Sequence, residues 1–335
     1  MNREEKIFFK LSEFRKEFDS IFLKTIPTEP KTLYEIVKYH FNVGGKRWRP
    51  FLVRAVCKCL GGTAEQSLPL EISLEYIHNW SLIHDDIEDS EEMRRGESTV
   101  WKAFGLPRAV NVGDTMGALE IEVLSSGQKA WGEERLNEIY QMMGEAIRKM
   151  CEGQNDELDL RERKENVEEK EVLEMMQKKT GALIKFGLIG IAKILNASPE
   201  VVKGLEEYAI KMPLAFQIQD DQLNLIGGEE YGKEIGGDIK EGKRTVQLTH
   251  CLKNCGENDR ERIISILLKP REQKTKEEVD FVIQKIRETG SLDYALELSR
   301  KFALEAVEAI KILPDCEEKE TMKNIVLWLA LDRKF

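Results

Sequence analysis

Proline is scarce in this sequence, and its distribution favours helices. The chain of 335 residues has 9 prolines, and none falls within residues 51–68, 108–198 or 214–269. Because proline removes a helical hydrogen bond and clashes with the preceding turn, such intervals leave room for long helices. Alternation of apolar and polar residues, which would indicate a strand, never persists for long. The sequence therefore predicts an all-α protein.

Long apolar runs and an excess of positive charge are also missing. No stretch approaches the roughly eighteen apolar residues of a membrane span, so we expect no integral membrane segment. The first residues lack the apolar core and cleavage site of a signal peptide. The 51 Lys and Arg residues against 61 Asp and Glu residues give a net charge of −10. This balance argues against nonspecific nucleic-acid binding, and an anionic substrate would need a local basic patch.

The cysteines lack a recognisable pairing pattern. The chain has 6 of them, at positions 57, 59, 151, 251, 255 and 316, with no paired C-x-x-C spacing. The 4 histidines lie far from them in sequence. A zinc site or a disulfide framework is therefore not expected, and the pattern favours reduced thiols in a cytoplasmic protein.

Helical apolar spacing is what fills the proline-free intervals, for example within residues 52–60 and 183–189. Helices are predicted to begin at Ser198-Pro199-Glu200, with proline in the first turn, and at the capping box Thr275-Lys276-Glu277-Glu278. No internal repeat or low-complexity linker divides the chain. The prediction is one helical domain over residues 1–335.

Two aspartate-rich segments stand out from this helical background. They are His84-Asp85-Asp86-Ile87-Glu88-Asp89 and Gln219-Asp220-Asp221-Gln222-Leu223-Asn224. Each places side-chain oxygens one helical turn apart on the same face, as Asp85 and Asp89 show. Such carboxylates repel one another unless a cation lies between them, and hard oxygen ligands suit Mg²⁺. Mg²⁺ held by few carboxylates completes its shell with water and phosphate oxygens, so the motifs predict a phosphate-bearing substrate.

Basic blocks with adjacent glycines form a second kind of motif. They are Gly44-Gly45-Lys46-Arg47-Trp48-Arg49-Pro50, Met93-Arg94-Arg95-Gly96, Lys179-Thr180-Gly181 and the segment from Gly232 to Thr245. Lysine and arginine bind phosphate directly, and glycine lets backbone approach an anion closely. Two independent phosphate-binding devices indicate two phosphorylated substrates, or one substrate with two phosphate ends.

Together these blocks, in this order from about residue 44 to 249, resemble the trans-isoprenyl diphosphate synthases, the head-to-tail polyprenyl synthase family. The resemblance implies a bundle of antiparallel helices around a deep central cavity, and usually a homodimer. It also implies a Mg²⁺-dependent condensation of isopentenyl diphosphate with an allylic diphosphate, either dimethylallyl, geranyl or farnesyl diphosphate.

The resemblance assigns roles to matching residues. It implies about three Mg²⁺ ions per active site, held by Asp85, Asp89 and Asp220, with Asp86 supporting and Asp221 and Asp238 nearby. Allylic diphosphate would contact Arg94, Lys179, Gln217 and Lys233. Isopentenyl diphosphate would contact Lys46, Arg49, His78 and Arg95, with Arg47 close by. Lys243 is a further substrate-binding residue, not assigned to either substrate. Thr180 and Gln217 would place oxygens near the allylic cation.

Two further positions are left open by the motifs. Asn224 stands where many relatives have a third aspartate, so it keeps an oxygen but loses a charge. The segment Gly153-Gln154-Asn155-Asp156-Glu157 resembles another family block, but which acidic residue takes the usual place is ambiguous.

Residues just upstream of the first motif are expected to set the product length. Trp80, Ser81 and Ile77 precede Asp85 by 5, 4 and 8 residues. Helical spacing alone places Ser81 beneath Asp85, and the importance of Trp80 comes from the resemblance. In the family that the chain resembles, one aromatic residue at that position is typical of geranylgeranyl (C20) synthases. Because tryptophan is larger than the usual phenylalanine or tyrosine, farnesyl diphosphate (C15) is the second expected product. The alternative is that Trp80 points into a helix interface and another residue forms the tunnel floor.

Two other functions remain open from the sequence. A longer-chain polyprenyl diphosphate synthase would share the chemistry but needs Trp80 outside the tunnel. A non-catalytic prenyl-binding partner subunit usually lacks aspartates in one motif, whereas both motifs are essentially intact here.

Overall fold

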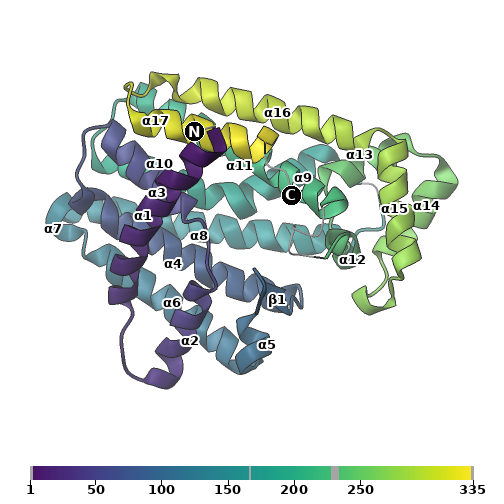
Figure 1. Ribbon diagram of the computed structural model, residues 1–335, viewed down its shortest axis with the longest axis horizontal. Coiled ribbons are helices and arrows are strands. Elements are labelled where there is room, and N and C mark those ends of the chain that lie inside the picture. The colour runs from purple at the N-terminus through teal and green to yellow at the C-terminus, as the bar shows by residue number, and fades with distance from the viewer. Residues whose placement is uncertain (1–2, 166, 228–233, 333–335) are drawn as a thin grey trace. The chain divides into compact units, whose positions relative to one another are not determined.

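The computed structural model describes residues 3–165, 167–227 and 234–332, and helices dominate this part of the chain (Figure 1). In these ranges the only sheet is one two-stranded antiparallel hairpin, formed by β1 (Met93–Arg94) and β2 (Glu97–Ser98). The all-α prediction is confirmed.

The chain groups into two compact units, each built from segments that are separate in sequence. Unit 1 comprises residues 1–145, 183–206 and 310–325, and unit 2 comprises residues 146–182, 207–309 and 326–335. The prediction of a single domain over 1–335 stays a prediction.

Unit 1 contains the first aspartate-rich motif at the end of its longest complete helix. Its helices are α1 (Arg3–Thr25), α2 (Lys31–Asn42), α3 (Trp48–Cys59), α4 (Ala64–Glu88), α5 (Val100–Phe104), α6 (Leu106–Ser125), α7 (Gln128–Trp131), the first half of α8 (Glu133–Glu162), nearly all of α10 (Ala182–Ile194), the start of α11 (Pro199–Ile226) and most of α17 (Glu317–Leu327).

A row of aromatic side chains forms one part of the unit 1 core. Phe14, Phe18 and Phe22 recur every fourth residue on α1, so they share one face of that helix and are buried. The ring of Phe22 stacks on Phe41 at a centroid distance of 4.1 Å and contacts the ring of Tyr76 at 4.4 Å. Because Tyr76 lies on α4, this row fixes the middle of the helix that carries the first motif.

A glycine allows α10 to pack closely against α3 and α4. A Cβ atom at Gly187 would lie 2.8 Å from side-chain carbons of both Leu74 and Val53. Any larger residue would force these helices apart, because a packed core has no spare volume there.

One disulfide joins two distant parts of unit 1. Cys59, at the end of α3, is bonded to Cys316, just before α17, with the two Cα atoms 6.1 Å apart. The prediction that all the cysteines are reduced thiols is therefore wrong for this pair. The pairing has no local signature because 257 residues separate its members. Cys57, Cys151, Cys251 and Cys255 are not disulfide-bonded.

Loss of this disulfide should lower the stability of the protein. A cross-link between such distant residues restricts the unfolded chain, so Cys59→Ser should reduce the free energy of unfolding by about 2 to 4 kcal/mol. Thermal melting without reductant measures this, with Cys151→Ser at an exposed, unbridged cysteine as the control. If a reducing agent leaves the wild-type melting temperature unchanged, the bond makes no such contribution.

Unit 2 contains the second aspartate-rich motif. Its helices are the second half of α8, α9 (Glu169–Met176), the end of α11, α12 (Gly237–Glu241), α13 (Val246–Asn254), α14 (Glu257–Leu267), α15 (Lys276–Glu288) and α16 (Ser291–Ala309). A π-helical turn, Gln177–Gly181, follows α9, and another, Trp328–Asp332, follows α17.

The core of unit 2 lies among α12, α13, α14 and α15. Buried side chains of these helices and of the end of α11 pack together, including Ile239, Leu248, Ile263 and Val282. Both predicted helix starts are confirmed: α11 begins at Pro199, and α15 begins with the Thr275 side chain accepting the Glu278 backbone N–H. Across the described part of the chain, no helix is long and apolar enough to cross a membrane.

Candidate active site

The first motif ends α4 and leads into the β1–β2 hairpin, which carries Arg94. The Arg94 guanidinium donates from Nε to Asp86 at 2.8 Å and from Nη2 to the same carboxylate at 2.6 Å. Asp86 is buried, and its second oxygen Oδ2 has no hydrogen-bond partner among the described residues. Burial raises the pKa of Asp86, and the charge of Arg94 acts against that shift. Asp86 thus orients Arg94.

Asp85 differs from Asp86 in exposure. Its side chain is 23% exposed, and one of its oxygens lies 3.7 Å from Arg94 Nη2. Asp89 caps the C-terminus of α4, donating its backbone N–H to the Asp85 carbonyl at 2.9 Å. Of the three aspartates in this motif, Asp85 is therefore the one with the clearest access to a ligand.

Arg49 and His78 form a basic pair between α3 and α4. Arg49 Nη1 and His78 Nε2 are 3.0 Å apart. Burial lowers the pKa of His78 well below its usual range, and the charge of Arg49 lowers it further. The imidazole is therefore neutral at pH 7, so Nε2 accepts from Arg49 and Nδ1 carries the proton. Arg49 Nε is buried without a hydrogen-bond partner in the described chain.

Positive charge accumulates around this pair. The pKa of Arg49 is lowered to about 10, mainly by burial and also by the charge of Arg95, against the opposing effect of Glu75. Burial also lowers the pKa of His40 to about 3, with Arg94 and Arg95 contributing. Cations that disfavour one another's charge indicate a site built for an anion.

Arg47 is engaged in a different way from its neighbours. Its guanidinium donates to Asp19 at 2.8 Å and to Glu75 at 3.1 Å, and it also binds the backbone carbonyls of Gly44 and Phe41. It is 4% exposed. These contacts hold the loop that presents Lys46, which is exposed and lies 5.3 Å from the ring centroid of Phe8.

Glycine is required where this loop meets the hairpin. A Cβ atom at Gly45 would lie 2.7 Å from Arg47 Nη1 and 3.0 Å from Arg95 Nη1. The φ angle of Gly45 is +138°, which side chains rarely adopt. The Arg95 guanidinium donates to the Gly44 carbonyl. The glycine pair therefore lets both arginines approach the loop.

The three residues expected to set product length have different environments. Ile77 is fully buried, and the Ser81 hydroxyl donates to the His78 carbonyl of its own helix at 2.9 Å. Trp80 is partly exposed and its indole Nε1 donates to Glu120 on α6 at 2.6 Å. Trp80 therefore faces α6, and which side chain forms the tunnel floor stays a prediction.

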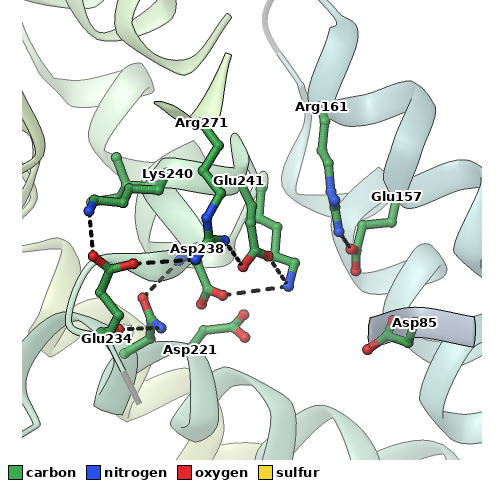
Figure 2. Close-up of polar contacts among 12 residues, drawn as sticks. Asp85, Glu157, Arg161, Asp221, Glu234, Asp238, Lys240, Glu241 and Arg271 are labelled. Atoms are coloured by element: carbon green, nitrogen blue, oxygen red, sulfur yellow. Dashed lines mark hydrogen bonds and ion pairs between the residues drawn. The ribbon is translucent and has the colours of Figure 1, made fainter. Parts of the chain in front are cut away.

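In unit 2, Lys179 and Thr180 lie in the π-helical turn after α9. Such turns often occur at functional sites because the extra residue redirects side chains. Lys179 Nζ lies 3.0 Å from Glu157 on α8. Arg161 pairs with the same carboxylate, as Figure 2 shows. Lys178 instead pairs with Asp156. Of the two acidic residues that the sequence left open, Glu157 is the one that contacts Lys179.

Replacing Gly153 should disrupt this arrangement. A Cβ atom there would lie 2.3 Å from the backbone nitrogen of Lys179, so Gly153→Ala must push α8 and the π-helical turn apart. We expect a loss of about 1 to 3 kcal/mol in unfolding free energy and weaker binding of the substrate that Lys179 contacts.

Denaturant unfolding and the KM of each substrate measure these effects. The matched control is Gly144→Ala on the same helix, where a Cβ atom would meet nothing within 4 Å. That variant should be neutral or slightly more stable, since alanine favours helix. Equal behaviour of the two variants would contradict the close approach at Gly153.

The second motif places two carboxyls close together. Asp221 is buried, and burial raises its pKa well above the usual range, with the Asp238 carboxylate raising it further. Gln217 Nε2 donates to Asp221 Oδ1 at 2.9 Å, which leaves the Gln217 side-chain oxygen for another partner. Asp220, the predicted metal ligand, is partly exposed. Figure 2 shows Asp221 and Asp238 near each other, with Asp238 on α12.

Asn224 holds the loop that presents Asp238. Its side-chain oxygen accepts the Asp238 backbone N–H at 3.1 Å, and its Nδ2 donates to the Glu234 carbonyl at 3.5 Å. Its own carbonyl accepts the Gly236 N–H at 2.8 Å. Asn224 is thus committed to the loop, and Asp238 supplies a third carboxylate beside Asp220 and Asp221. Lys233, predicted to bind allylic diphosphate, lies outside the described residues.

Ion pairs hold Glu234 and Glu241, which lie on either side of Asp238 in sequence (Figure 2). Arg271 binds Glu241 at 2.8 Å and Glu234 at 3.3 Å, and Lys240 also pairs with Glu234. Lys243 lies 3.7 Å from Asp238 and 2.5 Å from Glu241. Lys243 therefore partly balances the charge of Asp238, and it lowers the pKa of Asp221 against the larger effect of burial.

The donor set fits Mg²⁺. Within the described chain no three His, Cys, Asp or Glu side chains gather into a site that holds an ion by itself. Partly exposed aspartates such as Asp85 and Asp220 instead offer one or two oxygens each. This suits Mg²⁺, which is commonly held by one or two carboxylates together with water and substrate phosphates.

Sequence reasoning left Glu157 open beside Asp156, and it did not single out Glu120. Glu157 follows a Gly-Gln pair in a recognisable block, so its spacing was a usable signal. Glu120 lies in a mostly apolar stretch of α6 that also contains Glu122, and its partner Trp80 is 40 residues away. No local pattern reveals such a contact.

The chain was compared with known proteins. A model of the polyprenyl synthetase family matches residues 30–286. A geranylgeranyl pyrophosphate synthase of Geoglobus acetivorans is 32% identical over 301 residues, covering 90% of this chain and 91% of the relative. A geranylfarnesyl diphosphate synthase of Natronomonas pharaonis is 28% identical, covering 98% and 99%. The crystal structure of geranylgeranyl pyrophosphate synthetase from Pyrococcus horikoshii superimposes with a TM-score of 0.90 at 31% identity, covering 98% of this chain and 99% of that one.

Proposed function

This chain belongs to the polyprenyl synthetase family and is a prenyltransferase of the short-chain isoprenyl diphosphate synthase type, and from that premise we propose how its residues divide the reaction. The reaction is chain elongation, in which isopentenyl diphosphate condenses with an allylic diphosphate. The proposal concerns the substrate-binding residues, the metal, the product and the assembly.

The observation that carries the assignment of the isopentenyl diphosphate site is the crowding of Arg49, Arg94 and Arg95 around His78. Burial and mutual repulsion lower the pKa of Arg49 and His78, so the pocket gains when a multiply charged anion arrives. Lys46, Arg49, His78 and Arg95 bind this diphosphate. Arg47 acts by holding the loop, because its donors already have protein partners.

A second set of residues binds the allylic diphosphate. It consists of Arg94, Lys179, Gln217 and Lys243, with Lys233 as a further member outside the described residues. Asp86 orients Arg94, and Glu157 orients Lys179. Cations preset in this way stabilise the charge that builds on the leaving oxygen without having to reorganise during the reaction.

The metal is proposed to be Mg²⁺, held by Asp85, Asp89 and Asp220, with Asp221 and Asp238 close to the last. When bound, it neutralises charge on the allylic diphosphate and favours cleavage of the carbon–oxygen bond. The family expectation is about three ions per site.

The bond changes then follow from the substrates. The allylic C1–O bond breaks and its electron pair leaves with diphosphate. Oxygens of Thr180 and Gln217 stabilise the allylic cation. The double bond of isopentenyl diphosphate attacks C1 of the allylic cation. The proton then lost from C2 of the isopentenyl unit passes to the released diphosphate. No protein base is required for this step.

We propose geranylgeranyl diphosphate as the main product, with farnesyl diphosphate the second candidate. Trp80 supports this, because a large side chain near the first motif limits the space for a growing chain. The likeness to a geranylfarnesyl diphosphate synthase keeps a longer product as the alternative. A non-catalytic prenyl-binding subunit is less favoured, because Asp85, Asp89 and Asp220 are all present.

The test is to incubate the purified protein with isopentenyl diphosphate, Mg²⁺ and the C5, C10 or C15 allylic diphosphate, and to measure product length by mass spectrometry. A C15 or C20 product supports the proposal. A longer product keeps the chemistry and moves the tunnel floor away from Trp80. Absence of any condensation would favour the partner-subunit alternative.

A homodimer is also proposed, and α6 supplies the supporting surface. Leu106, Val110 and Ile121 are 49%, 42% and 49% exposed, and their spacing places them within about one third of the helix circumference. An exposed apolar stripe of this kind marks an interaction surface. Light scattering that gives the mass of one chain would contradict this.

We further propose that the two compact units form one domain, because the division between them falls inside α8, α10, α11 and α17. Units that share continuous helices are poor candidates for independent folding. A cytoplasmic location is retained as a proposal from the sequence alone.

A further inference from the structure

Glu120 is a buried carboxyl group in a helix face that is otherwise apolar. It lies on α6, is 3% exposed and accepts the Trp80 indole N–H at 2.6 Å. Among the described residues, burial and this indole are the only causes of its pKa shift, and no charged side chain contributes. Burial raises the pKa of Glu120 to about 8, so the group is mostly a neutral acid at pH 7.

A buried carboxyl group without a cation is costly, and an apolar residue would fill this position at lower cost. The carboxyl instead fixes the orientation of the Trp80 indole. The indole has a single hydrogen-bond donor, its N–H. A short hydrogen bond from this donor to a group fixed on another helix restrains the χ2 rotation of the ring. Glu120 therefore determines where the largest side chain in this part of α4 lies.

Two glycines, Gly113 and Gly117, lie on the same face of α6 as Glu120. One turn along α4, the His84 ring lies 5.5 Å from the Trp80 ring, and Gly113 on α6 accommodates it, since a Cβ atom there would be 2.2 Å from His84 Nε2. Gly117, one turn before Glu120, has no heavy atom within 4 Å of its Cβ position. Gly117 therefore adds no side chain that could hold the indole in place.

We propose that Glu120 is a specificity-determining positioning residue, which sets the length of the prenyl product by holding the Trp80 indole across the gap between α4 and α6. The inference rests on the proposed function, because it assumes that the chain is elongated along the side of α4 that Trp80 occupies. Glu120 itself touches no reacting atom.

Two substitutions separate the acceptor from the volume of the side chain. Glu120→Gln keeps both the length and an accepting oxygen, whereas Glu120→Met keeps the volume and removes the acceptor. With isopentenyl diphosphate, Mg²⁺ and the C10 or C15 allylic diphosphate, Glu120→Gln should give the wild-type product. Glu120→Met should raise the ratio of longer to main product on the order of tenfold, as expected for loss of one buried hydrogen bond.

Trp80→Phe supplies the second side of the test, since it keeps an aromatic ring but has no donor. Its product should shift in the same direction as that of Glu120→Met, and the double variant should show no further shift. Additive shifts, or an unchanged product in Glu120→Met, would overturn the proposal. Failure of the wild-type protein to condense any substrate would instead overturn the proposed function, so the two failures are distinguishable.

Thermal melting across pH checks that Glu120 is the buried acid described above. A carboxyl whose folded pKa is raised stabilises the fold below its unfolded pKa, near 4.5, and this contribution is lost as pH rises to about 8. The melting temperature of the wild type should therefore fall over this interval relative to Glu120→Gln, which does not titrate. Parallel curves for the two proteins would overturn the proposal, because they would show that Glu120 is not held as described. The titratable groups on the neighbouring helix faces, His84 and Asp114, are unchanged in both proteins.

Discussion

Asp85→Ala is expected to lower kcat by a factor on the order of 10³ or more, because it removes a charge that acts on the leaving diphosphate. Asp85 is the partly exposed carboxylate of the first motif, and it lies 3.7 Å from the arginine proposed to bind the same diphosphate. Asp86 remains paired with Arg94 in this variant, so the hairpin should keep its position. Steady-state kinetics with saturating Mg²⁺ measures the loss, and circular dichroism and melting temperature show that the fold is retained.

The matched control is Glu88→Ala, which removes an exposed carboxylate from the same turn of α4. If charge density alone mattered, the two variants would lose similar activity. We expect Glu88→Ala to stay within about threefold of wild type, since surface substitutions away from a site have small effects. Asp85→Asn should resemble Asp85→Ala, because the amide keeps the shape but not the charge. Near-normal turnover of either Asp85 variant would remove Asp85 from the metal site.

Local patterns carried most of what the sequence predicted correctly. The helix starts at Pro199 and Thr275 depend on side chains within four residues, and these are visible in the printed order. The same is true of the motif spacing, which predicted a helix at Asp85, and the structure places Asp85 in the last turn of α4 and Asp89 at its C-cap. Hydrogen-bond geometry of a helix repeats every turn, so neighbours in sequence are sufficient to predict it.

Long-range contacts account for what the sequence could not provide. The Cys59–Cys316 disulfide and the pairing of Trp80 with Glu120 join residues that no spacing rule relates. Asn224 looked like a weakened metal ligand, whereas its side chain holds the loop of Asp238. A residue type that fits two roles is resolved only by knowing which partner lies within hydrogen-bond distance.

The basic motif shows the same limit within a single block. Arg47 and Arg49 are two residues apart and chemically identical, and the resemblance placed both near isopentenyl diphosphate. In the structure Arg47 is surrounded by acceptors from the protein, and Arg49 Nε lacks one. Burial and charge therefore distinguish a structural arginine from one that is ready for a ligand.

Arg49→Ala should raise the KM for isopentenyl diphosphate on the order of 10²-fold, with a much smaller change in the KM for the allylic substrate. Arg49 is partly buried, and its pKa is lowered to about 10. Its guanidinium carbon lies over the Trp48 ring, 4.4 Å from the ring centroid. Loss of a preset guanidinium that binds phosphate removes a strong charge-assisted contact. The fold should be barely affected, because the hydrogen bond that Arg49 gives up is to the neutral His78 ring and not to a carboxylate.

Arg47→Ala, two residues earlier, should give the opposite result and so serves as the control. Removing it takes an ion pair from the almost fully buried Glu75, which still accepts from the Asn79 amide, and another from Asp19, which keeps Arg15. Breaking such a pair costs about 3 kcal/mol or more in unfolding free energy. The melting temperature should fall sharply, while the protein that remains folded should keep much of its affinity for isopentenyl diphosphate. If Arg47→Ala changes KM and not stability, or Arg49→Ala changes stability and not KM, the division of roles between the two arginines is wrong, and Arg47 must be counted among the ligands of the diphosphate.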